Sequence, residues 1–237
     1  MTKEQWNHFL SFRENFKEHC QAWSALSNVL EPLQKEAAQK DTPDYQVENP
    51  VVYNTDLDKI TPSDTIKLIV IGDNPGKNEQ LTKNRRYLCG QAGKIADGFF
   101  KRNPVLAIDF RKNVIILNKT PVHTAKTAHL KSLLKSGNKE VADIIIESQV
   151  WMAKATASLH QSLYAANTDA PCKLWLVGYS ELKGKGLFLP YQNAFYEAYK
   201  NKADEWNAVK VYQHFSMNRF SIDLAAFQAE NRFKQNP

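Results

Sequence analysis

Four short apolar runs constrain the fold of this chain more than any other feature of its sequence. Each is rich in Val, Ile and Leu, and such runs are typical of strands that are buried on both faces. They cover residues 66–71, 114–117, 174–177 and 209–212. Segments with helix-like apolar spacing lie between them, and strands that alternate with helices pair in parallel under helices on both faces. The sequence therefore predicts an α/β fold.

The helical segments complete this prediction. Apolar residues at steps of three and four from Trp6 to Leu30 predict a first helix, which we expect to end near Pro32. Further helices are expected at 91–101, 140–164, 191–201 and 221–227. Residues 41–63 contain scattered prolines and no clear period, so we expect a connecting coil there.

We therefore expect one domain over residues 1–237. Its core, residues 64–237, is expected to be a three-layer α/β/α sandwich around a central four-stranded parallel sheet. Residues 1–63 are expected to supply a helix and a loop that pack on this core.

Composition narrows the class of protein. The chain has 237 residues, of which 43% are hydrophobic and 24% charged, and its 9 Gly and 10 Pro are too few for a low-complexity chain. The apolar runs are too short to span a membrane, and the first residues lack the basic start and apolar stretch of a signal peptide, so we expect a cytoplasmic protein. Cys20, Cys89 and Cys172 have no zinc-site spacing. The formal net charge of +6 is compatible with a polyanionic partner.

Each predicted strand is followed by a polar or glycine-rich loop. These loops contain residues 72–76, 118–121, 178–180 and 214–219. Ligands of open parallel sheets bind beyond the carboxyl ends of the strands, so the four loops are expected to converge on one site. The first loop, Gly72-Asp73-Asn74-Pro75-Gly76, is not a phosphate-binding Walker loop, because Asn78 follows Gly76-Lys77 where Ser or Thr is required.

The order of these motifs resembles that of the uracil-DNA glycosylase superfamily between about residues 66 and 223. Gly72-Asp73-Asn74-Pro75-Gly76 resembles its G-x-[DN]-P-G motif, and Glu79 with residues 86–94 is similar to a glycine-rich segment of the thermophile-type branch. Asn118 closes the second strand as the base-reading Asn of the family does. His214-Phe215-Ser216 resembles the H-P-S signature after the last strand. The cysteines do not match those of the iron–sulfur branch, so neither a cluster nor any other cofactor is implied.

The resemblance implies a role for each matching residue. Asn74 would orient the attacking water, with Asp73 as an alternative water-activating carboxylate or a turn cap, and His214 would donate to the departing base. Asn118 would read the N3–H and O4 edge of uracil, and Tyr87 would stack on the flipped base. Gly72, Pro75 and Gly76 would border the base. In the most uracil-selective branch a Tyr stands in place of Gly76, so looser selectivity is expected.

The loop after the fourth strand would handle the DNA. Ser216 would hold a phosphate, Met217 would wedge into the base stack, and Asn218 and Arg219 would contact the backbone or the orphaned partner. An electrostatic cradle could come from further basic residues, or these could be solvated surface. They are Lys83, Arg85, Arg86, Lys94, Lys183 and Lys185.

Three functions are thus open. The first is a monofunctional DNA glycosylase of base excision repair, acting as a monomer on DNA that contains uracil or another deaminated base. The second is a catalytically weak or inactive relative that binds nucleic acid or nucleotide, suggested by Phe215 and Met217 where the family has proline. The third is a metal-dependent hydrolase that processes nucleotides, which a chelator would separate from the first.

Overall fold

A parallel four-stranded sheet lies at the centre of the molecule, as the sequence predicts. In the computed structural model, which describes residues 1–164, 171–217, 220 and 222, the strand order is β2-β1-β3-β4 and every strand pairs in parallel with its neighbours. The strands are β1 (Leu68–Gly72), β2 (Val114–Asn118), β3 (Lys173–Val177) and β4 (Val209–Tyr212). The α/β class and the parallel sheet are confirmed.

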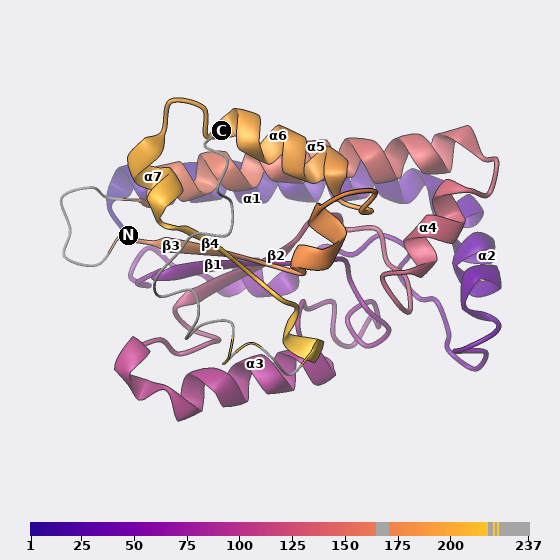
Figure 1. Ribbon diagram of the computed structural model, residues 1–237, viewed down its shortest axis with the longest axis horizontal. Coiled ribbons are helices and arrows are strands. Elements are labelled where there is room, and N and C mark those ends of the chain that lie inside the picture. Colours follow the sequence, from indigo (N-terminus) through magenta and orange to yellow (C-terminus); the bar gives the residue numbers. More distant parts are fainter. Residues whose placement is uncertain (165–170, 218–219, 221, 223–237) are drawn as a thin grey trace.

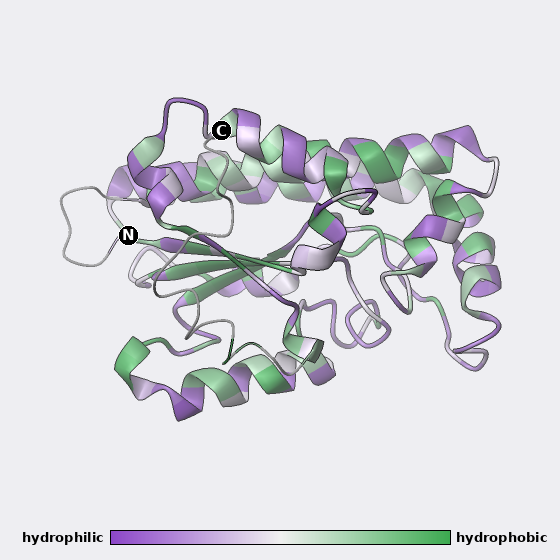
Figure 2. Ribbon diagram, in the orientation of Figure 1, coloured by the Kyte–Doolittle hydropathy of each residue, from purple (hydrophilic) through white to green (hydrophobic). Residues whose placement is uncertain are grey.

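Helices cover both faces of this sheet (Figure 1). On one face lie α1 (Lys3–Trp23), α5 (Lys139–Leu163) and α6 (Leu189–Ala198), and on the other lies α3 (Gln91–Arg102). The shorter helices are α2 (Ser27–Ala38), α4 (His129–Leu134) and α7 (Ala203–Asn207). The strands are almost uniformly hydrophobic, and the helices are amphipathic (Figure 2). The arrangement is that of a three-layer sandwich.

The first helix ends earlier than expected. A 3₁₀ turn, η1 (Ser24–Leu26), separates α1 from α2, and the Ser24 hydroxyl donates to the carbonyl of Cys20 at 2.7 Å. Pro32 lies inside α2 instead of ending a helix, so that prediction is wrong. Since Pro lacks only its own backbone N–H, α2 continues with one intrahelical hydrogen bond fewer.

Other boundaries differ by a few residues, and two short helices, α4 and α7, were not expected. The predicted coil of residues 41–63 contains a 3₁₀ turn, η2 (Thr55–Lys59), and a single antiparallel bridge between Val51 and Val122. The helix expected at 221–227 lies outside the described residues apart from Ile222.

The N-terminal helix shares the core of the sheet. Phe9, Phe12 and Phe16 of α1 belong to the same buried cluster as the strands. Rings of Phe12 and Phe16 stack on Trp151 of α5, with centroids 6.3 and 5.8 Å apart. Residues 1–63 are therefore packed on the α/β core. Among the helices that the structure describes, none has the length and apolar character needed to cross a membrane.

Parallel register brings the strand-end loops together. Gly72, the last residue of β1, pairs with Asn118, the last residue of β2, and the backbone N–H of Lys119 donates to the carbonyl of Gly72. The 3₁₀ turn η4 (Tyr179–Leu182) follows β3, and η5 (Phe215–Met217) follows β4 and contacts α3. The four loops thus leave the sheet at one edge.

Candidate functional site

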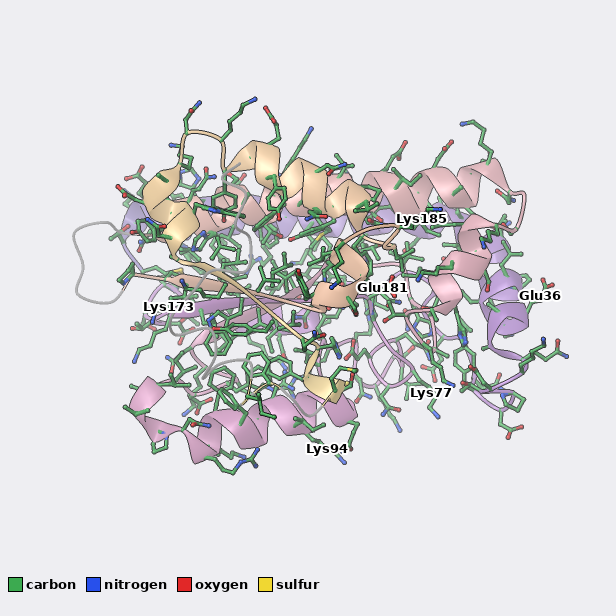
Figure 3. The ribbon with its side chains drawn as sticks, viewed as in Figure 1. Glu36, Lys77, Lys94, Lys173, Glu181 and Lys185 are labelled. Atoms are coloured by element: carbon green, nitrogen blue, oxygen red, sulfur yellow. The ribbon has the colours of Figure 1, made fainter. Side chains whose placement is uncertain are left out.

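A cavity of about 520 Å³ opens at the carboxyl ends of the strands. Its walls come from the loops that follow the four strands and from the segment before α3. Residues that line it include Asp73, Asn74, Gly76, Glu79, Leu88, Asn118, Thr124, Glu181, His214, Ser216 and Met217. In Figure 3, Glu181 and Lys77 lie towards this end of the molecule, whereas Lys173, which begins β3, lies at the opposite end of the sheet.

Asn118 lies at the floor of the cavity with an unused hydrogen-bond donor. Its side chain is 1% exposed, and its amide nitrogen Nδ2 has no hydrogen-bond partner within the described part of the chain. Gly72 makes this position possible, because a Cβ at Gly72 would lie 2.4 Å from Asn118 Oδ1. A buried donor without a partner costs about 1–3 kcal/mol, and in the cavity wall Nδ2 of Asn118 is free to donate to a ligand.

Asn74 is held by its amide nitrogen. Nδ2 donates to the Thr124 hydroxyl at 2.8 Å and to the Val122 carbonyl at 3.2 Å. These bonds fix the amide and leave Oδ1 as the oxygen that accepts further hydrogen bonds. Because Asn74 lines the cavity, this acceptor is suited to hold a water molecule.

Asp73 is paired with a buried lysine. Lys119 Nζ donates to Asp73 Oδ1 at 2.6 Å, and the Lys119 side chain has no exposed surface. Gly178 makes room for the carboxylate from β3, since a Cβ there would lie 2.2 Å from Asp73 Oδ1. The carboxylate is therefore confined at the edge of the cavity beside a cation.

His214 is half-buried and its tautomer is fixed by Ser216. The backbone N–H of Ser216 donates to His214 Nδ1 at 3.3 Å, and the Ser216 hydroxyl lies 2.7 Å from the same nitrogen. Nδ1 is therefore an acceptor, and the neutral ring carries its proton on Nε2. Burial lowers the pKa of His214, Asp73 opposes this effect and Lys119 adds to it. The lowered pKa favours the neutral imidazole, whose Nε2–H is a donor.

Glu79 is a second buried carboxyl group in the cavity wall. Burial raises its pKa to about 7, while the backbone N–H groups of Gly76, Leu88 and Cys89 act in the opposite direction. The Gly76 N–H lies 3.2 Å from Glu79 Oε2. Glu79 thus connects the loop after β1 to the segment before α3.

The cavity brings together most of the expected site residues. Asp73, Asn74, Gly76, Asn118, His214, Ser216 and Met217 all line it. Gly72 and Pro75 are not among the lining residues. Gly72 lies behind Asn118, and the Pro75 carbonyl faces the buried ring of His123, with Nδ1 at 2.8 Å. Both shape the loop instead of bordering a ligand.

Tyr87 does not face the cavity, so the expectation that it stacks on a base is corrected. It is fully buried, and its hydroxyl donates to the Val52 carbonyl at 2.5 Å. The backbone turns at Leu88, where φ is +48°, and the Arg111 guanidinium donates to the carbonyls of Tyr87 and Leu88. This turn directs Tyr87 into the core, and Leu88 lines the cavity in its place.

Ser216 and Met217, two of the residues expected to meet DNA, line the cavity. Met217 is 57% exposed and Ser216 is exposed, while Asn218 and Arg219 lie outside the described residues. Lys77 and Lys126 also line the cavity and were not expected there, and Lys126 pairs with Asp41 at 2.8 Å. Of the expected cradle, Arg86 pairs with Asp56 at 2.5 Å and Lys183 lies over the Tyr179 ring, so these two are already engaged.

Sequence reasoning did not assign a role to Lys119 or Thr124. Lys119 follows a strand end and looks like a solvated loop lysine, and its burial becomes visible only once β1 and β3 flank it. Thr124 lies 50 residues from the Asn74 that it binds. In the sequence, the contact between Lys119 and Asp73 is suggested only by opposite charges at the ends of two neighbouring strands.

The part of the chain that the structure describes contains no group of three or more His, Cys, Asp or Glu side chains arranged to hold a metal ion. A comparison of the chain with family models, curated proteins and solved structures finds no match. The resemblance to the glycosylase superfamily therefore rests on the motifs and their order.

Proposed function

We propose that the protein is a monofunctional DNA glycosylase that removes uracil or a related deaminated base from DNA. The observation that carries this proposal is the unpaired amide nitrogen of Asn118 at the floor of the cavity. A carboxamide offers a donor and an acceptor side by side, which complements the O4 and N3–H of uracil and mismatches cytosine. The same proposal includes a uracil-DNA glycosylase-like fold.

His214 supports the proposal from another strand-end loop. Breaking the bond between the base and C1′ leaves the electron pair on the base and positive charge on the sugar. The Nε2–H of a neutral His214 would donate to a base carbonyl as this negative charge develops. Donation by a neutral ring stabilises the leaving anion without requiring a proton from solvent.

Asn74 would position the attacking water molecule. Its fixed Oδ1 would accept a hydrogen bond from the water molecule whose oxygen forms the new bond to C1′. The remaining proton would pass to solvent or to the departing base, and an abasic site would be left. No covalent enzyme intermediate is required.

The surroundings fit a flipped base that is larger than uracil. A Cβ at Gly76 would contact nothing within 4 Å, so space is open at this border of the cavity. Lys77 in the cavity lining would attract the phosphate backbone, and the exposed Met217 would fill the gap left in the base stack. We infer from these features that lesions other than uracil are accepted.

The test is base release from labelled oligonucleotides that carry one uracil, single-stranded or opposite G or A, in the presence of a chelator. Alkali then cleaves the abasic product. We expect release by the wild type, and a loss of about 100-fold or more in His214→Ala and Asn74→Ala. His8→Ala, on the exposed face of α1, is the matched control and should retain the wild-type rate.

Release from none of these substrates by the folded protein would contradict the proposal. If DNA binding persisted without release, the binding-module alternative would replace it. Activity that the chelator abolished would favour the metal-dependent hydrolase.

A further inference from the structure

Lys119 ties three strand ends together from inside the protein. It follows β2 directly, and its Nζ donates to the Gly72 carbonyl of β1 at 3.3 Å and to the Val177 carbonyl of β3 at 2.5 Å. Its third bond goes to Asp73 Oδ1 at 2.6 Å, and Nζ lies 4.9 Å from the centre of the Phe188 ring. Burial lowers the pKa of Lys119, and Asp73 opposes this effect. Three acceptors match the three N–H bonds of an ammonium group, so the surroundings of Nζ favour the cation.

Asp73 is held equally tightly from its other side. Gly178 has φ of +90°, a conformation that favours glycine, and any Cβ there would lie within 3.0 Å of both carboxylate oxygens. The Asp73 carboxylate is therefore enclosed between Lys119 and the backbone of Gly178. His214 lines the same cavity as this carboxylate.

We propose that Lys119 is a positioning residue that fixes the Asp73 carboxylate in the wall of the cavity that His214 also lines, and neutralises it, so that the imidazole can donate from Nε2. The inference rests on the proposed function, because a neutral donor is what a departing base anion requires. Lys119 contacts neither the base nor the sugar; it acts on His214 through its own charge and through the Asp73 carboxylate that it holds.

The charges around His214 agree with this role. The Asp73 carboxylate raises the pKa of His214, and the Lys119 ammonium lowers it, adding to the effect of burial. Other charged groups line the same cavity from separate segments. They are Glu181 of η4, which also acts on Lys119, Glu79 and Lys77 of the loop after β1, and Lys126 of the loop after β2. Without Lys119, His214 would face an unneutralised carboxylate.

The experiment measures the pKa of the His214 ring by NMR in the wild type, Lys119→Met, Asp73→Asn and the double variant, with His214→Gln to assign the signal. We expect a rise of about one unit in Lys119→Met, because a carboxylate loses its cation, and a fall in Asp73→Asn. The double variant should lie above Asp73→Asn. In parallel, the acid limb of the base-release profile should move up by about one pH unit in Lys119→Met.

These outcomes separate the inference from the proposed function. The NMR titration needs no activity, so a wild type that releases no base leaves the Lys119 result intact. If Lys119→Met does not fold, the double variant decides, because removing both charges leaves no buried unpaired ion. Equal His214 pKa values in Asp73→Asn and the double variant, or an unchanged value in folded Lys119→Met, would overturn the inference. A merely structural role would lower the release rate equally at every pH.

Discussion

Polar side chains at the amino end of the sheet are exposed or bound to the backbone, whereas several at the carboxyl end are buried. At the amino end, polar side chains reach solvent or bind loop carbonyls: Lys67 Nζ donates to Ala107, Asn113 Nδ2 donates to Thr65, and Lys173 is exposed. At the carboxyl end, Lys119 and Asn118 are buried, and one of the donors of Asn118 is unpaired.

The stability of the fold explains where the polar groups lie at the amino end, but it does not explain the buried polar groups at the carboxyl end. Polar groups at the amino end cost little because water or the backbone satisfies them. Burying an ion pair and an unpaired amide lowers stability unless something compensates, and sites that bind a ligand are where proteins retain such groups. The carboxyl end therefore holds the groups that the proposed binding of a base would use.

The largest expected change in the free energy of unfolding comes from substituting Glu79, a buried carboxyl group at the carboxyl end of the sheet. The folded-state pKa of about 7 lies above the ordinary value of 4.5, so the folded state prefers the protonated carboxyl. The stability from this preference is full below about pH 4.5 and is lost as pH rises through 7. Glu79→Gln does not titrate, so its free energy of unfolding should gain about 3 kcal/mol relative to that of the wild type between pH 4.5 and 8.5.

Denaturant unfolding between pH 4.5 and 8.5 checks this difference. Glu147→Gln, which removes an exposed carboxylate from α5, is the control for the change in net charge. A difference between Glu79→Gln and the wild type that does not grow with pH would show that burial at this end costs no more than exposure.

A smaller effect is expected at Gly72, where a single methyl group tests how closely Asn118 is positioned. The new Cβ of Gly72→Ala would lie 2.4 Å from Asn118 Oδ1, so the amide must move. A displacement of about 1 Å costs on the order of 100-fold in rate, which corresponds to about 2.7 kcal/mol. Uracil release under single-turnover conditions measures it.

Gly76→Ala is the matched variant in the same loop. Its Cβ would meet nothing within 4 Å, so the free energy of unfolding should equal that of the wild type. Wild-type release by Gly72→Ala would mean that the position of Asn118 is unimportant.

The sequence predicted the sheet well because strands buried on both faces need continuous apolar runs. The apolar run Val114 to Leu117 forms a strand that is buried along its whole length. The loop after each such run then lies at the carboxyl edge of the sheet. The places of Asp73, Asn74, Asn118 and His214 at the cavity follow from this rule.

What the sequence could not predict depends on the direction of single side chains. Tyr87 and Leu88 are adjacent, and the positive φ at Leu88 decides which of the two faces the cavity. A lysine directly after a strand is typical of an exposed loop, yet the acceptors of Lys119 come from β1 and β3, which are distant in the sequence. Pro32 shows the same limit, because a turn at Ser24 ended α1 first.

The most direct test of the central claim measures stability and base release together in Asn118→Ala. If the unpaired amide is kept for a ligand, its removal should lower the free energy of unfolding by no more than the packing lost with the side chain, because no hydrogen bond within the described residues is lost from Nδ2. Uracil release should fall by about 100-fold. A variant that is less stable than the wild type but releases uracil at the wild-type rate would contradict the account.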